Sequence, residues 1–504
     1  MAQTRPQHPA LYQINTRAWL YENGKEPGRP ATLGDVPDAD LDRIAADGFD
    51  WMWPLGVWQT GEAGRDVSLH ETSWQHEYQE LLPDYANADV CGSPFAVRQY
   101  TVNRDFGGPR ALSSLRERLA TRGVGLVLDF VPNHTALDHP WVRAHPEYYV
   151  QGTEEDLARE PANYIRAETR HGPQVLAHGR DPYFPGWPDT LQLNYRHAGL
   201  RAAMCETLQS IASQCDGVRC DMAMLVLPDI VQRTWGERAR PADGTAPVDT
   251  SFWPEAIAAV RARHPGFVFV AEAYWDLEWR LQQEGFDYTY DKRLYDRLRD
   301  QDASSVRGHL NADPEYQRRS MRFLENHDEP RAASTFPNGV HDAAAVLGLL
   351  LPGLRLVHDG QVTGRRLRAS NHLRRRAPEP VDRERESFYR RLLACMRRPE
   401  VREGRWRLLP SQPAWDGNPT NQQIIASLWE GTEGHLLVAV NYGSHPAQGY
   451  VPLGNASISG STMRLHDLLH PRLTYDRPAA ELAERGLYLD VPPWRPHVFE
   501  VRAA

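Results

Sequence analysis

The stretch VGLVLDFVPNH, residues 124–134, is an apolar run that ends in polar residues. Strands covered on both faces read as such continuous runs, whereas a strand with one wet face alternates apolar and polar residues. An amphipathic helix with a glycine stop is expected over 108–123, directly before it. A helix followed by a doubly covered strand is the repeating unit of a parallel α/β sheet. We therefore expect 124–132 to be an interior strand.

The same alternation runs outward from this stretch in both directions. Strands are expected over 10–20, 50–58, 124–132, 216–224, 267–275, 286–291, 320–328 and 353–360. Further helices are expected over 38–49, 199–215 and 254–266. Eight strands with helical crossovers predict an α/β fold, a closed (β/α)8 TIM barrel.

Two long insertions divide the chain, and near residue 404 the alternation of strands and helices gives way to short strands separated by turns. Segment 59–100 follows the second strand and segment 135–195 follows the third, at the ends where barrel enzymes place their sites. Loops of that length are usually functional or form a subdomain. The predicted domains are a barrel over 1–134 and 196–404, an inserted subdomain over 135–195, and a C-terminal all-β sandwich over 405–504.

Composition excludes several classes of protein. The 504 residues carry a net charge of −9 without a basic block, which argues against nucleic acid as a partner. No apolar run approaches the ~20 residues of a membrane helix, and the first residues lack the pattern of a signal peptide. Five irregularly spaced cysteines predict neither a disulfide framework nor a zinc site, so a cytoplasmic location fits best. The oligomeric state is not predicted.

Polar residues gather at the ends of four predicted strands. They are Asp129, Asn133 and His134; Arg219 and Asp221; Glu272; and Glu325, His327 and Asp328. One acid at a strand end is ordinarily a helix cap or a surface ion pair. Four strands that bring acids, histidines and an arginine to one rim of a barrel instead predict a catalytic cleft.

Three of these acids suit glycoside hydrolysis, which needs one ionised and one protonated carboxyl group. Arg219 lies two residues before Asp221, so both side chains point to the same side of the strand. A neighbouring cation lowers the pKa of a carboxyl group, which favours Asp221 as nucleophile. Apolar and aromatic neighbours would raise the pKa of Glu272, which favours it as the acid. Asp328 would join them in the cleft.

Four motifs in this order resemble the α-amylase family of glycoside hydrolases and transglycosidases, glycoside hydrolase family 13. They are DFVPNH (129–134), GVRCDMA (217–223), VAEAYW (270–275) and FLENHD (323–328). The stretches GSPFAVRQYTV (92–102) and WPDTLQLNY (187–195) add to the likeness, which covers essentially the whole chain.

The resemblance implies a role for each matched residue. Asp221 would form a β-glycosyl-enzyme, Glu272 would protonate the leaving oxygen and then deprotonate the acceptor, and Asp328 would bind sugar hydroxyls. The implied substrate-binding residues are Arg219, His134, His327, Phe95, Asp129 and Tyr274. Among these, the histidines would bind hydroxyls of the reacting glucose, Phe95 would stack, and Asp129 would support the barrel rim.

Several positions depart from the family pattern. Met224 and Leu225 stand where many members have Lys-His, Phe95 replaces a tyrosine, and Gln99 replaces an acid. After the eighth strand, Gln361, Arg365 and Arg366 replace a common Tyr-Gly-Glu pattern. The two arginines would either bind an anionic group or belong to a solvated loop.

No metal or cofactor is expected. Asn133 matches a position that binds calcium in many family members, and Asp156, Asp181 and Asp189 are available in the inserted segment. We expect Asn133 to brace its loop instead.

The predicted function is a retaining glycoside hydrolase acting on α-glucans, malto-oligosaccharides or small α-glucosides. The alternative is a glucanotransferase, maltosyltransferase or phosphorolytic enzyme of the same family. A non-catalytic carbohydrate-binding relative is disfavoured, because such proteins typically lose one or more of the three carboxylates. A carbohydrate substrate is the expected partner.

Overall fold

The computed structural model describes residues 5–24, 30–337, 339–432, 434–454 and 461–504. Eight parallel strands close a barrel in the order β1-β14-β13-β12-β11-β10-β5-β2. Their bounds are β1 Ala10–Asn15, β2 Trp51–Leu55, β5 Gly125–Phe130, β10 Gly217–Cys220, β11 Val268–Ala271, β12 Tyr288–Tyr290, β13 Ser320–Arg322 and β14 Leu354–His358. Each lies inside a predicted strand, so the predicted α/β barrel is confirmed.

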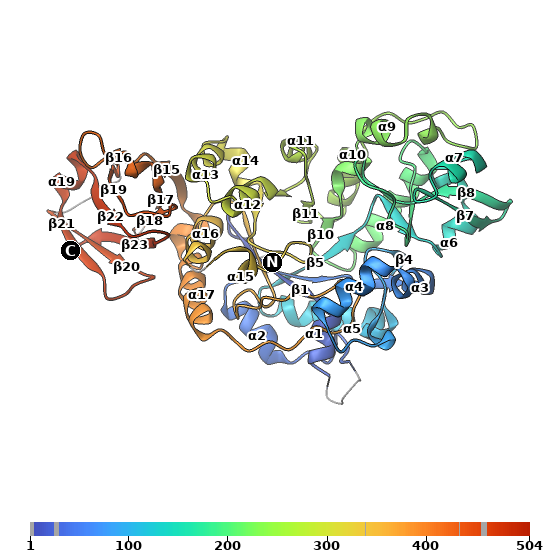
Figure 1. Ribbon diagram of the computed structural model, residues 1–504, viewed down its shortest axis with the longest axis horizontal. Helices are drawn as coiled ribbons and strands as arrows, with labels where there is room; N and C mark the ends of the chain where they lie inside the picture. The colour runs from blue at the N-terminus through green and yellow to red at the C-terminus, as the bar shows by residue number, and fades with distance from the viewer. Residues whose placement is uncertain (1–4, 25–29, 338, 433, 455–460) are drawn as a thin grey trace.

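Helices surround the barrel (Figure 1). They are α1 Thr16–Glu22, α2 Asp38–Ala46, α5 Gly108–Ala120, α8 Ala198–Ala212, α9 Pro228–Trp235, α10 Trp253–Arg261, α11 Glu278–Gln283, α12 Lys292–Arg299, α13 Ala303–Leu310, α14 Pro314–Arg318, α15 Ala332–Thr335, α16 Val340–Leu349, α17 Arg383–Met396 and α18 Pro399–Glu403. The three predicted helices 38–49, 199–215 and 254–266 correspond to α2, α8 and α10. Apolar faces of these helices and the barrel strands share one continuous core.

All eight strands are shorter than the predicted segments, and local features end the first two. The segment 10–20 becomes a helix at Thr16, because the Asn15 side chain accepts the Ala18 N–H at 3.2 Å and caps it. The segment 50–58 breaks at Gly56, whose φ of 73° favours glycine. A Cβ atom at Gly56 would also lie 2.4 Å from Pro94.

The two insertions carry their own elements. The first contains α3 Glu62–His70, α4 Thr72–Leu81 and a ribbon of β3 Trp58–Thr60 with β4 Val97–Val102. The second contains β6 His134–Ala136, α6 Pro140–Ala144, α7 Glu154–Arg159, the hairpin β7 Tyr164–Thr169 and β8 Gly172–Ala177, and β9 Thr190–Gln192, which pairs with β6. The exact domain boundaries stay predictions.

The C-terminal part is a sandwich of two antiparallel sheets, as predicted. Their strands are β15 Arg405–Leu409, β16 Gln412–Pro413, β17 Ile424–Glu430, β18 His435–Asn441, β19 Ala447–Val451, β20 Thr462–Asp467, β21 Thr474–Pro478, β22 Leu487–Val491 and β23 Pro496–Ala503, with α19 Ala479–Glu484 between β21 and β22. The sheet orders are β15-β17-β18-β23-β20-β21 and β16-β19-β22, with apolar side chains packed between them.

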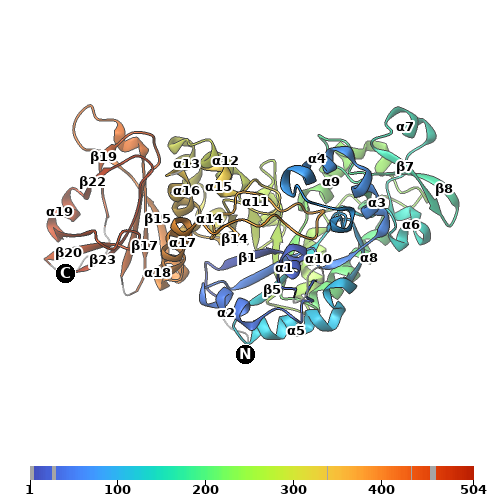
Figure 2. The ribbon, with the colours of Figure 1, turned by 60° about the horizontal axis from the view of Figure 1, so that its bottom comes forward.

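The larger sheet docks on the barrel helices (Figure 2). The Trp429 indole donates a hydrogen bond to the carbonyl of Leu350 at 2.9 Å, and the Tyr442 hydroxyl donates to the carbonyl of Leu298 at 2.6 Å. Both side chains are fully buried and belong to the same apolar core as the barrel strands.

Replacing Asp467 by asparagine is expected to lower the free energy of unfolding by about 1.5–3 kcal/mol. Asp467 is fully buried, and its Oδ2 accepts hydrogen bonds from Nδ1 of His470 at 2.8 Å and of His497 at 2.7 Å. Burial would raise the pKa of Asp467, but the two histidine hydrogen bonds hold that pKa well below its usual range. Its contribution to stability is thus present above about pH 4 and is lost as the pH falls.

Urea unfolding of the full chain measures the effect. Asp476→Asn is the control, because Asp476 pairs with Arg464 at 2.9 Å on an exposed face, where ion pairs contribute little to stability. Equal stability losses for the two variants would contradict the expected role of Asp467.

Candidate active site

A cavity of about 340 Å³ opens at the ends of the barrel strands, between the two insertions. It is lined by Trp74, Ser93, Phe95, His134, Trp187, Asp189, Thr190, Asp221, Met222, Glu272, Tyr274, Asp328 and His372. Asp221 follows β10 directly, Glu272 follows β11, and Asp328 lies six residues beyond β13. The structure thus gathers in one cavity the three acids that the sequence placed on separate strands.

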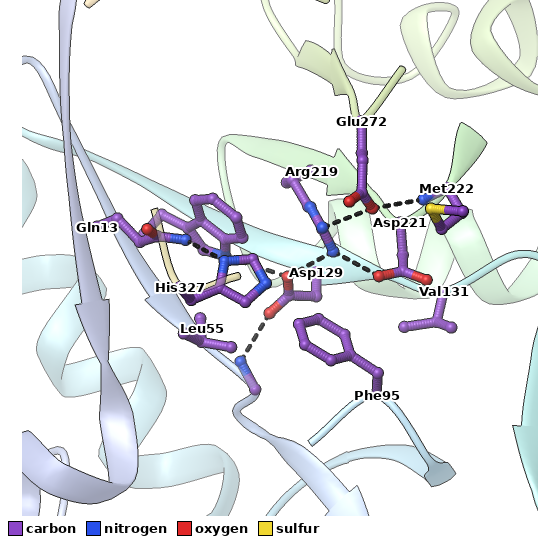
Figure 3. A network of polar contacts seen from close by, with 12 residues as sticks. Gln13, Leu55, Phe95, Asp129, Val131, Arg219, Asp221, Met222, Glu272 and His327 are labelled. Carbon is purple, nitrogen blue, oxygen red and sulfur yellow. Dashed lines mark hydrogen bonds and ion pairs between the residues drawn. The ribbon is translucent and has the colours of Figure 1, made fainter. Parts of the chain in front are cut away.

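Arg219 lies beneath this cavity and joins two of the acids (Figure 3). One guanidinium nitrogen, Nη1, donates to Asp221 Oδ1 at 2.7 Å, and the other, Nη2, donates to Glu272 Oε2 at 2.6 Å. The Arg219 side chain is 1% exposed and lies between the rings of Trp53 and Phe95. The contact with Asp221 was expected from the sequence, but the second contact, with Glu272, was not.

Glu272 is held on both of its oxygens. Oε2 also accepts the Met222 N–H at 2.7 Å, and Oε1 accepts the Tyr274 hydroxyl at 2.8 Å. Met222 adopts a left-handed conformation with φ of 41°, a local strain that aims its N–H at the carboxylate. Burial raises the pKa of Glu272 to about 7, although Arg219 acts in the opposite direction. A group with that pKa gives and takes a proton near neutral pH.

His327 connects Asp328 to the barrel interior. Its Nδ1 lies 2.7 Å from Gln13 Nε2, and its Nε2 lies 3.0 Å from Asp328 Oδ2. Because the Gln13 amide nitrogen donates, Nδ1 accepts and the proton resides on Nε2, which makes no hydrogen bond within the described residues. Burial lowers the pKa of His327 well below its usual value, so the ring is neutral. Asn326 Oδ1 accepts the Asp328 and Glu329 N–H groups at 2.9 Å and turns the chain here.

The Glu325 side chain bonds to residues of the loop after β13 and is not among the residues lining the cavity. Its Oε1 accepts a hydrogen bond from Arg331 Nη1 at 2.6 Å, and its Oε2 accepts the Ala332 N–H at 2.6 Å. Glu325 and Arg331 are both buried, so this ion pair fixes the chain that follows Asp328.

The remaining predicted residues divide between the cavity wall and its support. His134, Phe95 and Tyr274 line the cavity. Asp129 lies deeper, where Oδ1 accepts from the Trp53 indole at 3.1 Å and Oδ2 from the Gly56 N–H at 2.7 Å. These contacts are those of a rim support.

Sequence reasoning missed several lining residues. They are Trp74, Ser93, Trp187, Asp189, Thr190, Met222 and His372. Trp74 and Trp187 lie in the two insertions, and the aromatic residues of these segments were the only sequence signal that could have indicated them. Asp189 was named only as a calcium donor; burial raises its pKa to about 7, and its Oδ2 has no hydrogen-bond partner among the described residues.

The donors considered for calcium do not gather into one oxygen cage. Asn133 Oδ1 accepts from Gln192 Nε2 at 2.9 Å, which braces the loop. Asp156 caps α7 through the Thr153 N–H at 2.9 Å. Asp181 Oδ1 accepts the N–H groups of Tyr183 at 2.7 Å and Phe184 at 3.0 Å. The expected absence of a cofactor stays a prediction.

The departures from the family pattern also have structural outcomes. Met224 and Leu225 are buried, at 0% and 4% exposed, and are not among the residues lining the cavity. Arg365 pairs with Glu22 at 3.3 Å, so its charge is already compensated. The Gln361 side chain is buried and donates to the Tyr389 hydroxyl at 2.9 Å.

Among the described residues, no helix has the length and apolar character needed to cross a membrane.

Comparisons with known proteins show which family the chain resembles. A model of the α-amylase catalytic domain matches residues 95–376, more than half of the chain. The α-amylase MalA of Haloarcula japonica is 24% identical over 364 residues, covering 71% of this chain and 44% of that protein. The α-1,4-glucan:maltose-1-phosphate maltosyltransferase of Bifidobacterium longum is 24% identical over 250 residues, covering 47% of this chain and 25% of that protein. The chain therefore spans less than half the length of these two relatives.

A solved structure shares the whole fold. The noncanonic maltogenic α-amylase AmyB from Thermotoga neapolitana superimposes with a TM-score of 0.69 at 18% identity, covering 98% of both chains.

Proposed function

The chain belongs to the α-amylase family, and from this premise we propose that it hydrolyses α-glucosidic bonds through a covalent β-glycosyl-enzyme. The observation that carries the proposal is the Arg219 guanidinium, which holds one oxygen each of Asp221 and Glu272 on its two terminal nitrogens. Such close placement suits retaining enzymes, whose two carboxyl groups lie about 5–5.5 Å apart.

In the first step, protonated Glu272 gives its proton to the glycosidic oxygen while an Asp221 oxygen attacks the anomeric carbon. The bond to the leaving group breaks as the glycosyl–Asp221 bond forms, and Glu272 is left as a carboxylate. The Met222 N–H and the Tyr274 hydroxyl hold Glu272 in place throughout.

In the second step, the Glu272 carboxylate takes a proton from water as the water oxygen attacks the anomeric carbon. Asp221 leaves as a carboxylate, and two inversions restore the α configuration. Asp328 and His134 line the cavity where they meet hydroxyls of the bound sugar, and His327 Nε2 lies 3.0 Å from Asp328 Oδ2.

Transfer to an acceptor sugar is the second candidate function. A sugar hydroxyl in place of water gives it without any change in the protein, and one matched relative is a maltosyltransferase. The phosphorolytic version has less support, because Arg365 is already paired with Glu22.

Wild-type enzyme is expected to release the α anomer first from 4-nitrophenyl α-glucoside, as followed by proton NMR before mutarotation. First release of the β anomer would contradict the double displacement. Maltoheptaose digested with and without an added acceptor sugar separates the two outcomes. Hydrolysis gives only shorter products, whereas longer oligosaccharides would identify a transferase.

We also propose a cytoplasmic location, which rests on the cysteines. All five are free thiols in the structure, as expected in a reducing compartment.

A further inference from the structure

The segment between β14 and α17, residues 359–382, crosses the strand ends and reaches the first insertion; we call it the strap. It is orange in Figure 2, where it approaches blue α4. The Cys91 N–H donates to the His372 carbonyl at 2.7 Å, and the Arg374 N–H donates to the Asp89 carbonyl at 2.9 Å. Val90 and Leu373 form an antiparallel bridge between them. Strap and insertion are thus paired like two short strands.

Side chains fasten this contact further. Arg375 pairs with Asp84 and Asp89, each at 3.0 Å, and Arg368 pairs with Glu77 at 3.0 Å. An apolar cluster of Tyr78, Leu82, Val90 and Leu373 is buried between the two segments. A contact with its own small core is a packed wall and not a loose flap.

The wall presents two rings to the cavity. Trp74 of α4 and His372 of the strap lie 4.3 Å apart between ring centroids, and both line the cavity. Ser68 Oγ lies 2.9 Å from His372 Nδ1 and fixes the imidazole. Burial lowers the pKa of His372 to about 3, so this ring is neutral in the working range of pH.

The wall lines the cavity together with Asp328, which the proposed function places against the glycone, the sugar whose anomeric carbon reacts. The rings of Phe95 and His327 lie 5.2 Å apart between centroids, tilted by 33°, and His327 Nε2 lies 3.0 Å from Asp328 Oδ2. Burial raises the pKa of Asp328, while the charges of Arg219 and of the strap residue Arg368 lower it.

The leaving-group side is different. Beyond Glu272 and Tyr274, Trp275 meets Tyr183 at 5.1 Å between ring centroids. Tyr183 is 52% exposed and its neighbour Phe184 is 66% exposed. Neither residue is among those lining the cavity, and their solvent-exposed aromatic faces are suited to stacking against a leaving chain of sugars.

We propose that the Trp74–His372 wall closes the glycone end of the cleft, so that the enzyme attacks only the non-reducing end of a glucan and removes one glucosyl residue per turnover. This inference rests on the proposed function. A cavity of about 340 Å³ lies near the lower limit of ligand pockets, roughly 300–1,000 Å³. It suits one glucosyl ring and the start of the leaving group.

The test compares maltoheptaose with a free non-reducing end and the same oligosaccharide blocked there by a 4,6-O-ethylidene group. We expect glucose and maltohexaose as the first products of the free substrate, and turnover of the blocked one at least about 100-fold slower. Cleavage of both at similar rates, or first release of maltose, would overturn the inference. Failure to turn over even 4-nitrophenyl α-glucoside would instead count against the proposed function.

Variants locate the wall. In Trp74→Ala/His372→Ala the rate on the blocked substrate should rise about 10-fold relative to the free one. Trp279→Ala is the matched control, because this indole is 44% exposed and outside the cavity. His372→Ala alone removes no residue of the small core. If the double variant does not fold, the same rate ratio is measured with this single variant. An unchanged ratio in a variant that melts within about 4 °C of wild type would remove these residues from the wall.

Discussion

Asp221→Ala is expected to lower kcat/KM on 4-nitrophenyl α-glucoside by about 10⁴-fold or more, the scale on which loss of a covalent nucleophile is felt. The variant loses the oxygen that attacks the anomeric carbon, whereas Glu272 keeps its Met222 and Tyr274 contacts. Steady-state kinetics measures the loss. Asp276→Asn serves as the control, since the Asp276 side chain is 71% exposed and pairs with Arg293 on the surface.

Azide identifies the role of Asp221 beyond the loss of rate. A small anion that enters the space of the missing carboxylate attacks the anomeric carbon from the face opposite the leaving group. The product of Asp221→Ala with azide should therefore be β-glucosyl azide. Recovery of the α-azide, or kcat/KM within about 10-fold of wild type, would remove Asp221 from the nucleophile's position.

Glu272→Ala is expected to lower kcat/KM on maltoheptaose by about 10²–10⁴-fold, the usual contribution of a general acid. The loss should be much smaller on α-glucosyl fluoride, because fluoride leaves without protonation. A loss that is equal for both substrates would point to a structural defect. Asp276→Asn again serves as the control, four residues further along the chain.

The pH profile of the wild type follows from the raised pKa of Glu272. Burial raises that pKa to about 7, so the carboxyl group stays protonated up to near-neutral pH. The first step needs the protonated form, and kcat/KM should therefore fall as the pH rises through about 7. In Glu272→Ala with α-glucosyl fluoride, this alkaline fall should disappear. If it persists at the same pH in the variant, another group controls it.

The barrel could be predicted from sequence because each interior strand carries its own signal. The run 124–132 is apolar except for Asp129, and its neighbours repeat the pattern. The end of the first strand could not be predicted in this way, because one side-chain hydrogen bond from Asn15 converts 16–22 into a helix. Such a cap overrides the β-like character of the residues that follow.

The candidate site was predictable in its acids and less so in its geometry. Asp221 and Glu272 lie side by side because the register of β10 and β11 pairs Cys220 with Ala271. Register between parallel strands is set by tertiary packing, so the bridge from Arg219 to Glu272 had no signal in the sequence. Trp74 and His372 are almost 300 residues apart, and only the folded chain shows that their rings touch.

The strap has a consequence for how such an enzyme diversifies. The carboxylates lie at strand ends, whereas the strap and the insertion it meets lie outside the barrel strands and pair with one another. Insertions or deletions in these two segments would change which sugars the cleft accepts without altering the catalytic carboxylates. Substrate selectivity and catalysis therefore depend on different segments of the chain. Mutations can change the selectivity while the catalytic residues are kept.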